Sequence, residues 1–230
     1  MNKSGDHSNI KQVSYRNTMI KNNINITKGS GLFASGIRGF LTLLACSVFI
    51  TACSISPVDK SNFKYEGGFA DFDDIKIAVG DQAPDFTLPD ADGKQISLSS
   101  FKDKSHVLLV VYRGEWCPFC MSQLDSFESL LPLLGRFDIQ LVGVSPDISN
   151  KVNKARKKFD SDYIFLSDEN MEMIDLYGLR KNEDIPHPAT ILINSKGEIV
   201  WFYASSNFKV RPDALQMRKI IGKHLRNRTI

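Results

Sequence analysis

Two long apolar runs, and the segment between them, set the hydrophobic pattern of this chain. Residues 106–112 are a continuous β-branched and apolar segment, which is typical of a strand buried on both faces of a sheet, and residues 139–144 predict a second buried strand. Residues 117–134 place apolar side chains at intervals of three and four, which predicts a helix with one buried face. Long helices that follow buried strands indicate an α/β layered domain.

Shorter elements complete this layered domain. We expect a β-hairpin from residues 86–88 and 95–98 around a turn at 90–93, strands at 163–166, 189–194 and 198–203, and helices at 145–159, 171–177 and 211–224. The predicted fold class is therefore α/β, with a mixed β-sheet flanked by helices.

The first 53 residues follow a different pattern, that of an export signal. A basic lead precedes an apolar run over residues 40–52, and small residues close the run. This run is shorter than the roughly 20 residues that a membrane-spanning helix needs. Its end resembles a bacterial lipoprotein signal, in which Cys53 becomes the lipidated first residue of the mature protein. An uncleaved anchor and a simple cleaved signal are the alternatives.

The positive charge of the chain belongs to this N-terminal segment. The formal net charge is +3, but residues 1–53 hold six of the 29 Lys and Arg residues and one of the 26 acidic residues. The remainder is slightly acidic, so we expect no nucleic-acid partner. Residues 54–79 mix serine, proline, glycine and charges without periodicity, which predicts a flexible tether before a domain at 80–230.

Two of the four cysteines, Cys117 and Cys120, lie in the body of the chain, where a predicted strand passes into a predicted helix. A thiolate at a helix N-terminus faces unpaired N–H groups and the positive end of the helix dipole, which lower its pKa. We therefore expect Cys117 to be the nucleophile and Cys120, one turn further on, to resolve it as a disulfide. Pro118 fits the first turn because no hydrogen bond is lost there.

A zinc site and a purely structural disulfide are two other interpretations of this pair. A zinc site needs about four ligands, and the body of the chain offers no second Cys-x-x-Cys or His pair, so no metal is expected. A purely structural disulfide would close a very short loop and constrain the unfolded chain little. The spacing instead favours a redox centre of the thioredoxin type.

Four stretches occur in an order known from one family. They are GDQAPDFTL at 80–88, YRGEWCPFC at 112–120, LVGVS at 141–145 and PATILIN at 188–194. Residues 80–220 thus resemble the peroxiredoxin-like AhpC/TSA group of the thioredoxin superfamily. The resemblance implies a thioredoxin fold and a reversible Cys117–Cys120 disulfide, with no cofactor. It also implies that Pro188 is a cis-proline facing the cysteines, with His187 nearby.

The chain departs from that group at the residues that hold a peroxide. Typical members carry Pro-x-x-x-Thr-x-x-Cys and an arginine near the position of Pro188, and neither cysteine restores this motif. Arg113 and Arg211 are candidates for a cation near the thiolate, and Trp116 for an apolar platform beside an exposed groove. Glu115 and Asp85 are candidates for a carboxylate that assists proton transfer to Cys120.

The hypothesis from sequence is an exported thiol oxidoreductase, lipid-anchored in the cell envelope on the periplasmic side. Its substrate would be a peroxide or a disulfide-bearing protein, and a thioredoxin-like thiol reductant would regenerate it. The alternative is a redox-inactive binding module that keeps the thioredoxin fold.

Overall fold

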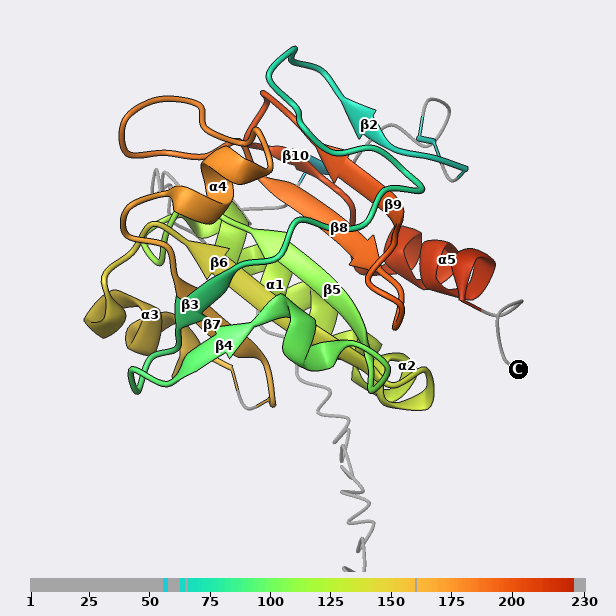
Figure 1. The fold of residues 1–230 in the computed structure, drawn as a ribbon, viewed down its shortest axis with the longest axis horizontal. Helices are drawn as coiled ribbons and strands as arrows, with labels where there is room; N and C mark the ends of the chain where they lie inside the picture. Colours follow the sequence, from blue (N-terminus) through green and yellow to red (C-terminus); the bar gives the residue numbers. More distant parts are fainter. Residues whose placement is uncertain (1–55, 58–62, 65, 160, 226–230) are drawn as a thin grey trace, which may run out of the picture. The chain divides into compact units, whose positions relative to one another are not determined.

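A mixed six-stranded sheet forms the centre of the computed structural model, which describes residues 56–57, 63–64, 66–159 and 161–225 (Figure 1). In spatial order its strands are β2 (Phe69–Ala70), β9 (Ile199–Ala204), β8 (Ala189–Ile193), β5 (His106–Val111), β6 (Ile139–Ser145) and β7 (Ile164–Ser167). Strand β5 runs parallel to β6 and antiparallel to β8, so the sheet is mixed, as predicted. The predicted signal and Cys53 lie outside the described residues.

The apolar runs form the middle of this sheet because both of its faces are covered. Along β5, Leu108 and Val110 join one apolar core while Leu109 and Val111 join the other, and each of these side chains is fully buried. Successive side chains of a strand point to opposite faces, so a strand between two cores must be apolar throughout. The prediction of doubly buried strands at 106–112 and 139–144 is confirmed.

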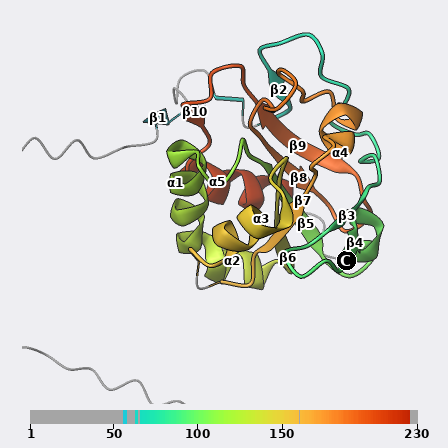
Figure 2. The same ribbon diagram turned by 90° about the vertical axis from the view of Figure 1, so that its left-hand side faces the viewer.

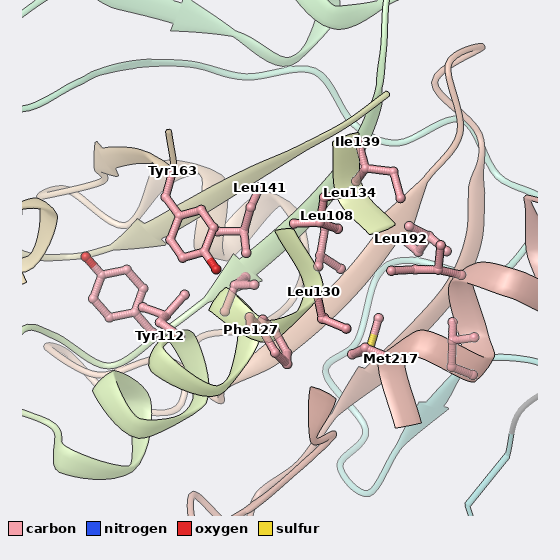
Figure 3. Close-up of a cluster of buried hydrophobic side chains, with 14 of the residues drawn as sticks. Leu108, Tyr112, Phe127, Leu130, Leu134, Ile139, Leu141, Tyr163, Leu192 and Met217 are labelled. Carbon is pink, nitrogen blue, oxygen red and sulfur yellow. The ribbon is translucent and has the colours of Figure 1, made fainter. Parts of the chain in front are cut away.

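Helices cover one face of the sheet, and a hairpin with a short helix covers the other (Figure 2). The first face carries α1 (Pro118–Phe127), α2 (Leu131–Arg136), α3 (Ser149–Arg156) and α5 (Ala214–His224). The second face carries α4 (Glu172–Leu176) and the hairpin of β3 (Thr87–Pro89) and β4 (Gln95–Ser97). The 3-10 helix η1 (Leu98–Phe101) follows this hairpin. Figure 3 shows the first core, where Phe127 and Leu130 meet Leu108 of the sheet and Met217 of α5.

Two predicted helices differ from the observed ones. The helix expected at 117–134 is divided into α1, the 3-10 turn η2 (Glu128–Leu130) and α2, with Pro132 in the first turn of α2. A proline has no N–H to donate, so it fits a new first turn better than a helix interior. The last helix begins after Asp213, whose side chain forms a capping box with Gln216. Arg211 therefore lies in β10 (Val210–Arg211) and not in the helix.

Much of the segment predicted as a tether packs against the domain. Phe63 is buried against the rings of Trp201 and Tyr203, and Ile77 is buried in the second core. Strand β2 joins the edge of the main sheet, and β1 (Ser56–Pro57) pairs in parallel with β10. The folded unit thus begins before residue 80, because isolated aromatic and apolar residues in a polar stretch find their partners only in the tertiary structure.

The described part of the chain holds no helix that is long and apolar enough to cross a membrane.

Candidate active site

Cys117 stands at the N-terminus of α1, at the corner where the chain leaves β5. It is the N-cap residue: its carbonyl accepts hydrogen bonds from the N–H groups of Cys120 and Met121, at 3.0 and 3.1 Å, and Pro118 is the first helical residue. The sequence prediction of a cysteine at a helix N-terminus is therefore confirmed. The unpaired N–H groups of the first turn favour negative charge at this position.

Cys117 and Cys120 form a disulfide, with Cα atoms 5.3 Å apart. Both cysteines are buried, with exposed fractions of 1% and 0%. The neighbouring Trp116 is 52% exposed, as a platform would be. Aromatic and arginine side chains from distant elements pack beside the cysteine pair. The exposed groove expected from sequence stays a prediction.

Arg211 brings a buried positive charge to the disulfide. Its Nη2 lies 3.3 Å from Sγ of Cys120 and 4.0 Å from Sγ of Cys117, and the side chain is 2% exposed. Within the described residues no carboxylate pairs with this guanidinium. Burial, reinforced by the nearby charge of Arg113, lowers the pKa of Arg211 to about 10, so it remains protonated at neutral pH.

Gln123 fixes the position of this arginine. Its Oε1 accepts a hydrogen bond from Nη1 of Arg211 at 3.3 Å, while its Nε2 donates to Thr190 Oγ1 and to the carbonyl of Pro212, both at 3.2 Å. A further bond runs from Nε of Arg211 to the carbonyl of Phe208. The guanidinium is held on two sides by neutral acceptors, and its third side faces the sulfurs. This arrangement leaves the charge available to a thiolate.

The loop between β5 and α1 depends on Gly114 and Asp147. Gly114 has a φ of 149°, and an added Cβ would lie 2.8 Å from Cδ1 of the Trp116 indole. The buried carboxylate of Asp147 accepts a hydrogen bond from the N–H of Glu115 at 2.6 Å. Glycine is needed here because other residues rarely adopt a positive φ.

Arg113 does not touch the sulfurs, although it was a candidate cation. Its guanidinium carbon lies 5.1 Å from the ring centre of Trp116 and 4.5 Å from that of Phe208. Its buried Nε has no hydrogen-bond partner in the described structure. Phe208 in turn packs edge-on against Phe119 of α1, with ring centres 5.6 Å apart. Arg113 thus belongs to the aromatic surroundings of the disulfide, and Arg211 is the cation in contact with it.

The expectation of a cis-proline is wrong, because the described chain contains no cis peptide bond and Pro188 follows a trans bond. Pro188 is nevertheless buried beside the active site, since it lines a small hollow together with Gln123 and Arg211. His187 stacks on Phe72, with ring centres 4.0 Å apart, and its described contacts do not include a cysteine. Burial, followed by repulsion from Lys181, lowers the pKa of His187.

The two carboxylates suggested for proton transfer have other partners. Glu115 forms an ion pair with Lys158 at 2.5 Å, and the hydrogen bond from Lys158 is the main cause that lowers the pKa of Glu115. Asp85 accepts hydrogen bonds from the N–H groups of Phe86 and Ser99, next to the hairpin. The described contacts of these two carboxylates therefore do not include Cys120.

Sequence reasoning missed several residues of this site. Gln123 is a polar residue on the buried face of α1, and that exception to the helical pattern was an available signal. Phe208, in the loop after β9, and the strand position of Arg211, in β10, had no such signal, because these residues meet the cysteines only through the tertiary fold.

The fold and this centre define a thioredoxin-fold protein with a Cys-x-x-Cys disulfide at a helix N-terminus. The sequence model described as the AhpC/TSA family matches residues 79–202, more than half of the chain, and the chain belongs to that family. Its similarity to proteins named thiol–disulfide oxidoreductase and to proteins named peroxiredoxin makes it an enzyme of the thiol–disulfide oxidoreductase and peroxiredoxin-like class.

One relative of each kind illustrates this similarity. Over 137 residues the chain is 27% identical to "Thiol-disulfide oxidoreductase ResA" of Bacillus cereus, an alignment that covers 59% of this chain and 74% of the relative. Over 130 residues it is 28% identical to "Peroxiredoxin Bcp" of Escherichia coli, covering 54% of this chain and 83% of the relative. The two identities are nearly equal, so similarity alone does not separate the two chemistries.

Solved structures show the same fold. The peroxidoxin BcpB of Mycobacterium tuberculosis matches with a TM-score of 0.58 and 23% identity, over 66% of this chain and 98% of that one. A thiol:disulfide interchange protein DsbE from Chlorobium tepidum matches with a TM-score of 0.53 and 23% identity, over 64% and 97%. At these identities the likeness establishes the thioredoxin fold alone.

Proposed function

We propose that this protein catalyses thiol–disulfide exchange, with Cys117 as the nucleophile, Cys120 as the resolving cysteine and Arg211 as the cation that stabilises their thiolates. The observation that carries the proposal is the buried guanidinium of Arg211, in contact with the disulfide and without a carboxylate partner in the described structure. A buried charge without a partner is costly. Reduction supplies the missing negative charge, so this site favours a thiolate.

Each half of the exchange uses this charge. The Cys117 thiolate attacks one sulfur of a substrate disulfide, and the substrate's second sulfur leaves as a thiolate. Cys120 then loses its proton, attacks Sγ of Cys117 and releases the first substrate sulfur. In the return step a donor thiolate attacks Cys117 and expels Cys120 as a thiolate, 3.3 Å from Arg211. Stabilising a leaving thiolate speeds its departure.

Peroxide reduction is the second candidate, and the same guanidinium supports it. In that reaction Cys117 attacks a peroxide oxygen and becomes a sulfenic acid, and the other oxygen leaves as water or an alcohol after protonation. Cys120 then condenses with the sulfenic acid to give the disulfide and water. A cation beside the sulfur can stabilise the charge that develops as the O–O bond breaks. The missing threonine of the peroxide motif argues for the exchange reaction instead.

Separate assays distinguish the two chemistries. The reduced chain, Cys117→Ser and Cys120→Ser are compared for reduction of the insulin disulfides and for consumption of hydrogen peroxide. We expect disulfide reduction to dominate, Cys117→Ser to be inactive and Cys120→Ser to accumulate a mixed disulfide on Cys117. Fast peroxide consumption with slow insulin reduction would favour the second candidate. Absence of both activities, with a pair that cannot be reduced, would indicate a binding module.

We also propose export and lipid anchoring through Cys53, which places the reaction in the cell envelope. The support is the sequence of residues 1–53, with its basic lead, apolar run and terminal cysteine. A single acyl chain binds a membrane only reversibly, so stable anchoring needs a second acyl chain or another membrane contact. Mass analysis of the protein from the membrane fraction tests this proposal, and an unmodified Cys53 in the mature protein would contradict it.

A further inference from the structure

A second guanidinium without a counter-charge lies close to the disulfide. Arg113 is only partly exposed, and it stands over the rings of both Trp116 and Phe208. Lys209 adds a third positive charge, with Nζ 5.8 Å from the ring centre of Phe208. We call Arg113, Trp116, Phe208 and Lys209 the Arg113 cluster. Neither of its cations forms an ion pair within the described part of the chain.

Stacking leaves the guanidinium of Arg113 able to bind an anion. Aromatic rings cover the flat faces of a guanidinium, whereas its N–H groups point outwards in its plane and match a carboxylate. In Arg113 those groups make no hydrogen bond to the described protein, and its Nε is buried without a partner. An anion that approaches the exposed Trp116 would therefore meet donors that are already positioned.

The charges around the cluster define where that anion can lie. Arg113 and Trp116 also line a hollow of about 290 Å³, together with the acidic residues Asp147, Glu169, Glu183 and Asp184 and the basic residue Lys151. The acids outnumber the single lysine, so they would repel an anion from the hollow itself. Phe208 and Lys209 are not part of its lining, and Phe208 lies directly beside Arg211 through the hydrogen bond to its carbonyl. The favourable side is therefore the one that carries the disulfide.

We propose that the Arg113 cluster recognises a negative charge next to the reacting sulfur, so that the preferred substrates are disulfides bearing a carboxylate or a similar anionic group. The proposal rests on the exchange chemistry proposed above and names its substrate class. The anion binds the N–H groups of Arg113, Lys209 adds long-range attraction, and Trp116 packs against the apolar part of the substrate. Binding there brings the substrate sulfur toward Cys117.

A matched pair of small disulfides tests this proposal. The whole 230-residue chain carries Cys46→Ser and Cys53→Ser in every form compared, so that only Cys117 and Cys120 have thiols. It is reduced in detergent, freed of reductant and mixed with dithiobis(nitrobenzoate), which is dianionic, or with dithiodipyridine, which is neutral. In either reaction the Cys117 thiolate attacks one sulfur and expels an aromatic thiolate, and Cys120 then closes the protein disulfide and releases the second. The probe gains the two electrons that the dithiol loses, and absorbance follows the rate.

The expected result is a loss confined to the anionic probe. Arg113→Gln should lower the second-order rate constant for dithiobis(nitrobenzoate) about 10-fold, as removal of one charge-assisted hydrogen bond predicts, and that for dithiodipyridine less than about 2-fold. Lys209→Gln should act in the same direction more weakly, with a reduced salt dependence. Arg136→Gln is the matched control, because Arg136 also stacks on an aromatic ring, that of Phe137, but belongs to α2.

Two results would overturn the inference while leaving the exchange reaction intact. An equal loss with both probes would mean that Arg113 tunes the thiol, and no loss with either would mean that it does not meet the substrate. If the unaltered reduced chain is oxidised by neither probe, the exchange function fails, and this inference fails with it.

Discussion

Arg211 is the residue to which we assign control of the disulfide, because its charge is buried and has no carboxylate partner among the described residues. Arg211 and Cys120 are separated by 91 residues in sequence, and β10 together with Gln123 brings them to within 3.3 Å. A cation in contact with a sulfur stabilises the thiolate relative to the thiol. This single contact links the redox chemistry of the site to a residue of the C-terminal strand.

Replacing Arg211 by methionine should raise the pKa of the reduced cysteines. The change removes the cation while keeping an unbranched side chain, so the thiolate loses its partner and its pKa rises by about one unit or more. Absorbance of the thiolate at different pH values measures the shift in the reduced protein. Arg136→Met is the control that changes a distant arginine. An unchanged cysteine pKa in Arg211→Met would contradict the role given to this residue.

The backbone at Gly114 is a second point where one residue supports the site. Gly114→Ala should lower the free energy of unfolding by about 1–3 kcal/mol, because the alanine must keep a positive φ and would also collide with Trp116. Gly135→Ala provides the contrast, since Gly135 lies in α2 with open space around it. That substitution should be neutral or slightly stabilising. Urea denaturation of both variants measures the difference, and equal effects would refute the argument.

At the scale of elements, the active site is a meeting point of three segments. The turn between β5 and α1 supplies Cys117, α1 supplies Cys120 and Gln123, and β10 supplies Arg211. β10 pairs with β1, which begins three residues after Cys53 in the sequence. Residues 56–57 are thus paired with the same strand that carries Arg211.

A substitution at Phe63 tests whether residues 54–79, predicted as a tether, are part of the folded unit. Phe63→Ala should lower the free energy of unfolding by about 3 kcal/mol, because the side chain is 6% exposed and packs on Trp201 and Tyr203. Lys64→Ala should have little effect, since Lys64 contributes its carbonyl, which accepts a hydrogen bond from Trp201 Nε1. Chemical denaturation measures both. A small effect for Phe63→Ala would restore the tether interpretation.

Most elements could be predicted because their signals are local. The doubly buried strands are apolar at nearly every position, and the hairpin has turn residues at its centre. The division of the helix after Phe127 was missed although Pro132 announces it, since the apolar spacing continues across the break. The short strands β1, β2 and β10 were missed because two residues carry no periodicity and pair only with distant partners.

At the scale of the whole molecule, redox state and stability are linked through the same arginine. The oxidised protein buries the charge of Arg211 without a partner in the described structure, whereas a reduced protein with a thiolate neutralises it. Stabilisation of the reduced form makes a disulfide more oxidising. The reduction potential therefore depends on a difference in folding stability between the two redox states.

Thermal unfolding of both redox forms tests this linkage. In Arg211→Met the reduced form should lose stability relative to the oxidised form. At neutral pH the Tm of the oxidised form minus that of the reduced form should therefore increase by about 3 °C. The reduction potential should become more negative in the same variant. The control Arg136→Met should behave like the unaltered protein. If it does, and the Tm difference of Arg211→Met is unchanged or shifts in the opposite direction, the charge does not act on the thiolate.

The sequence by itself determined the layered α/β domain and the place of Cys117 at a helix N-terminus, because apolar periodicity, turn residues and a Cys-x-x-Cys spacing act over a few neighbouring residues. Only the tertiary structure decided which cation meets the sulfurs, that the cysteines are buried, and that Pro188 follows a trans bond. Those features depend on contacts between segments far apart in the chain, and no local pattern encodes the partner of a buried charge.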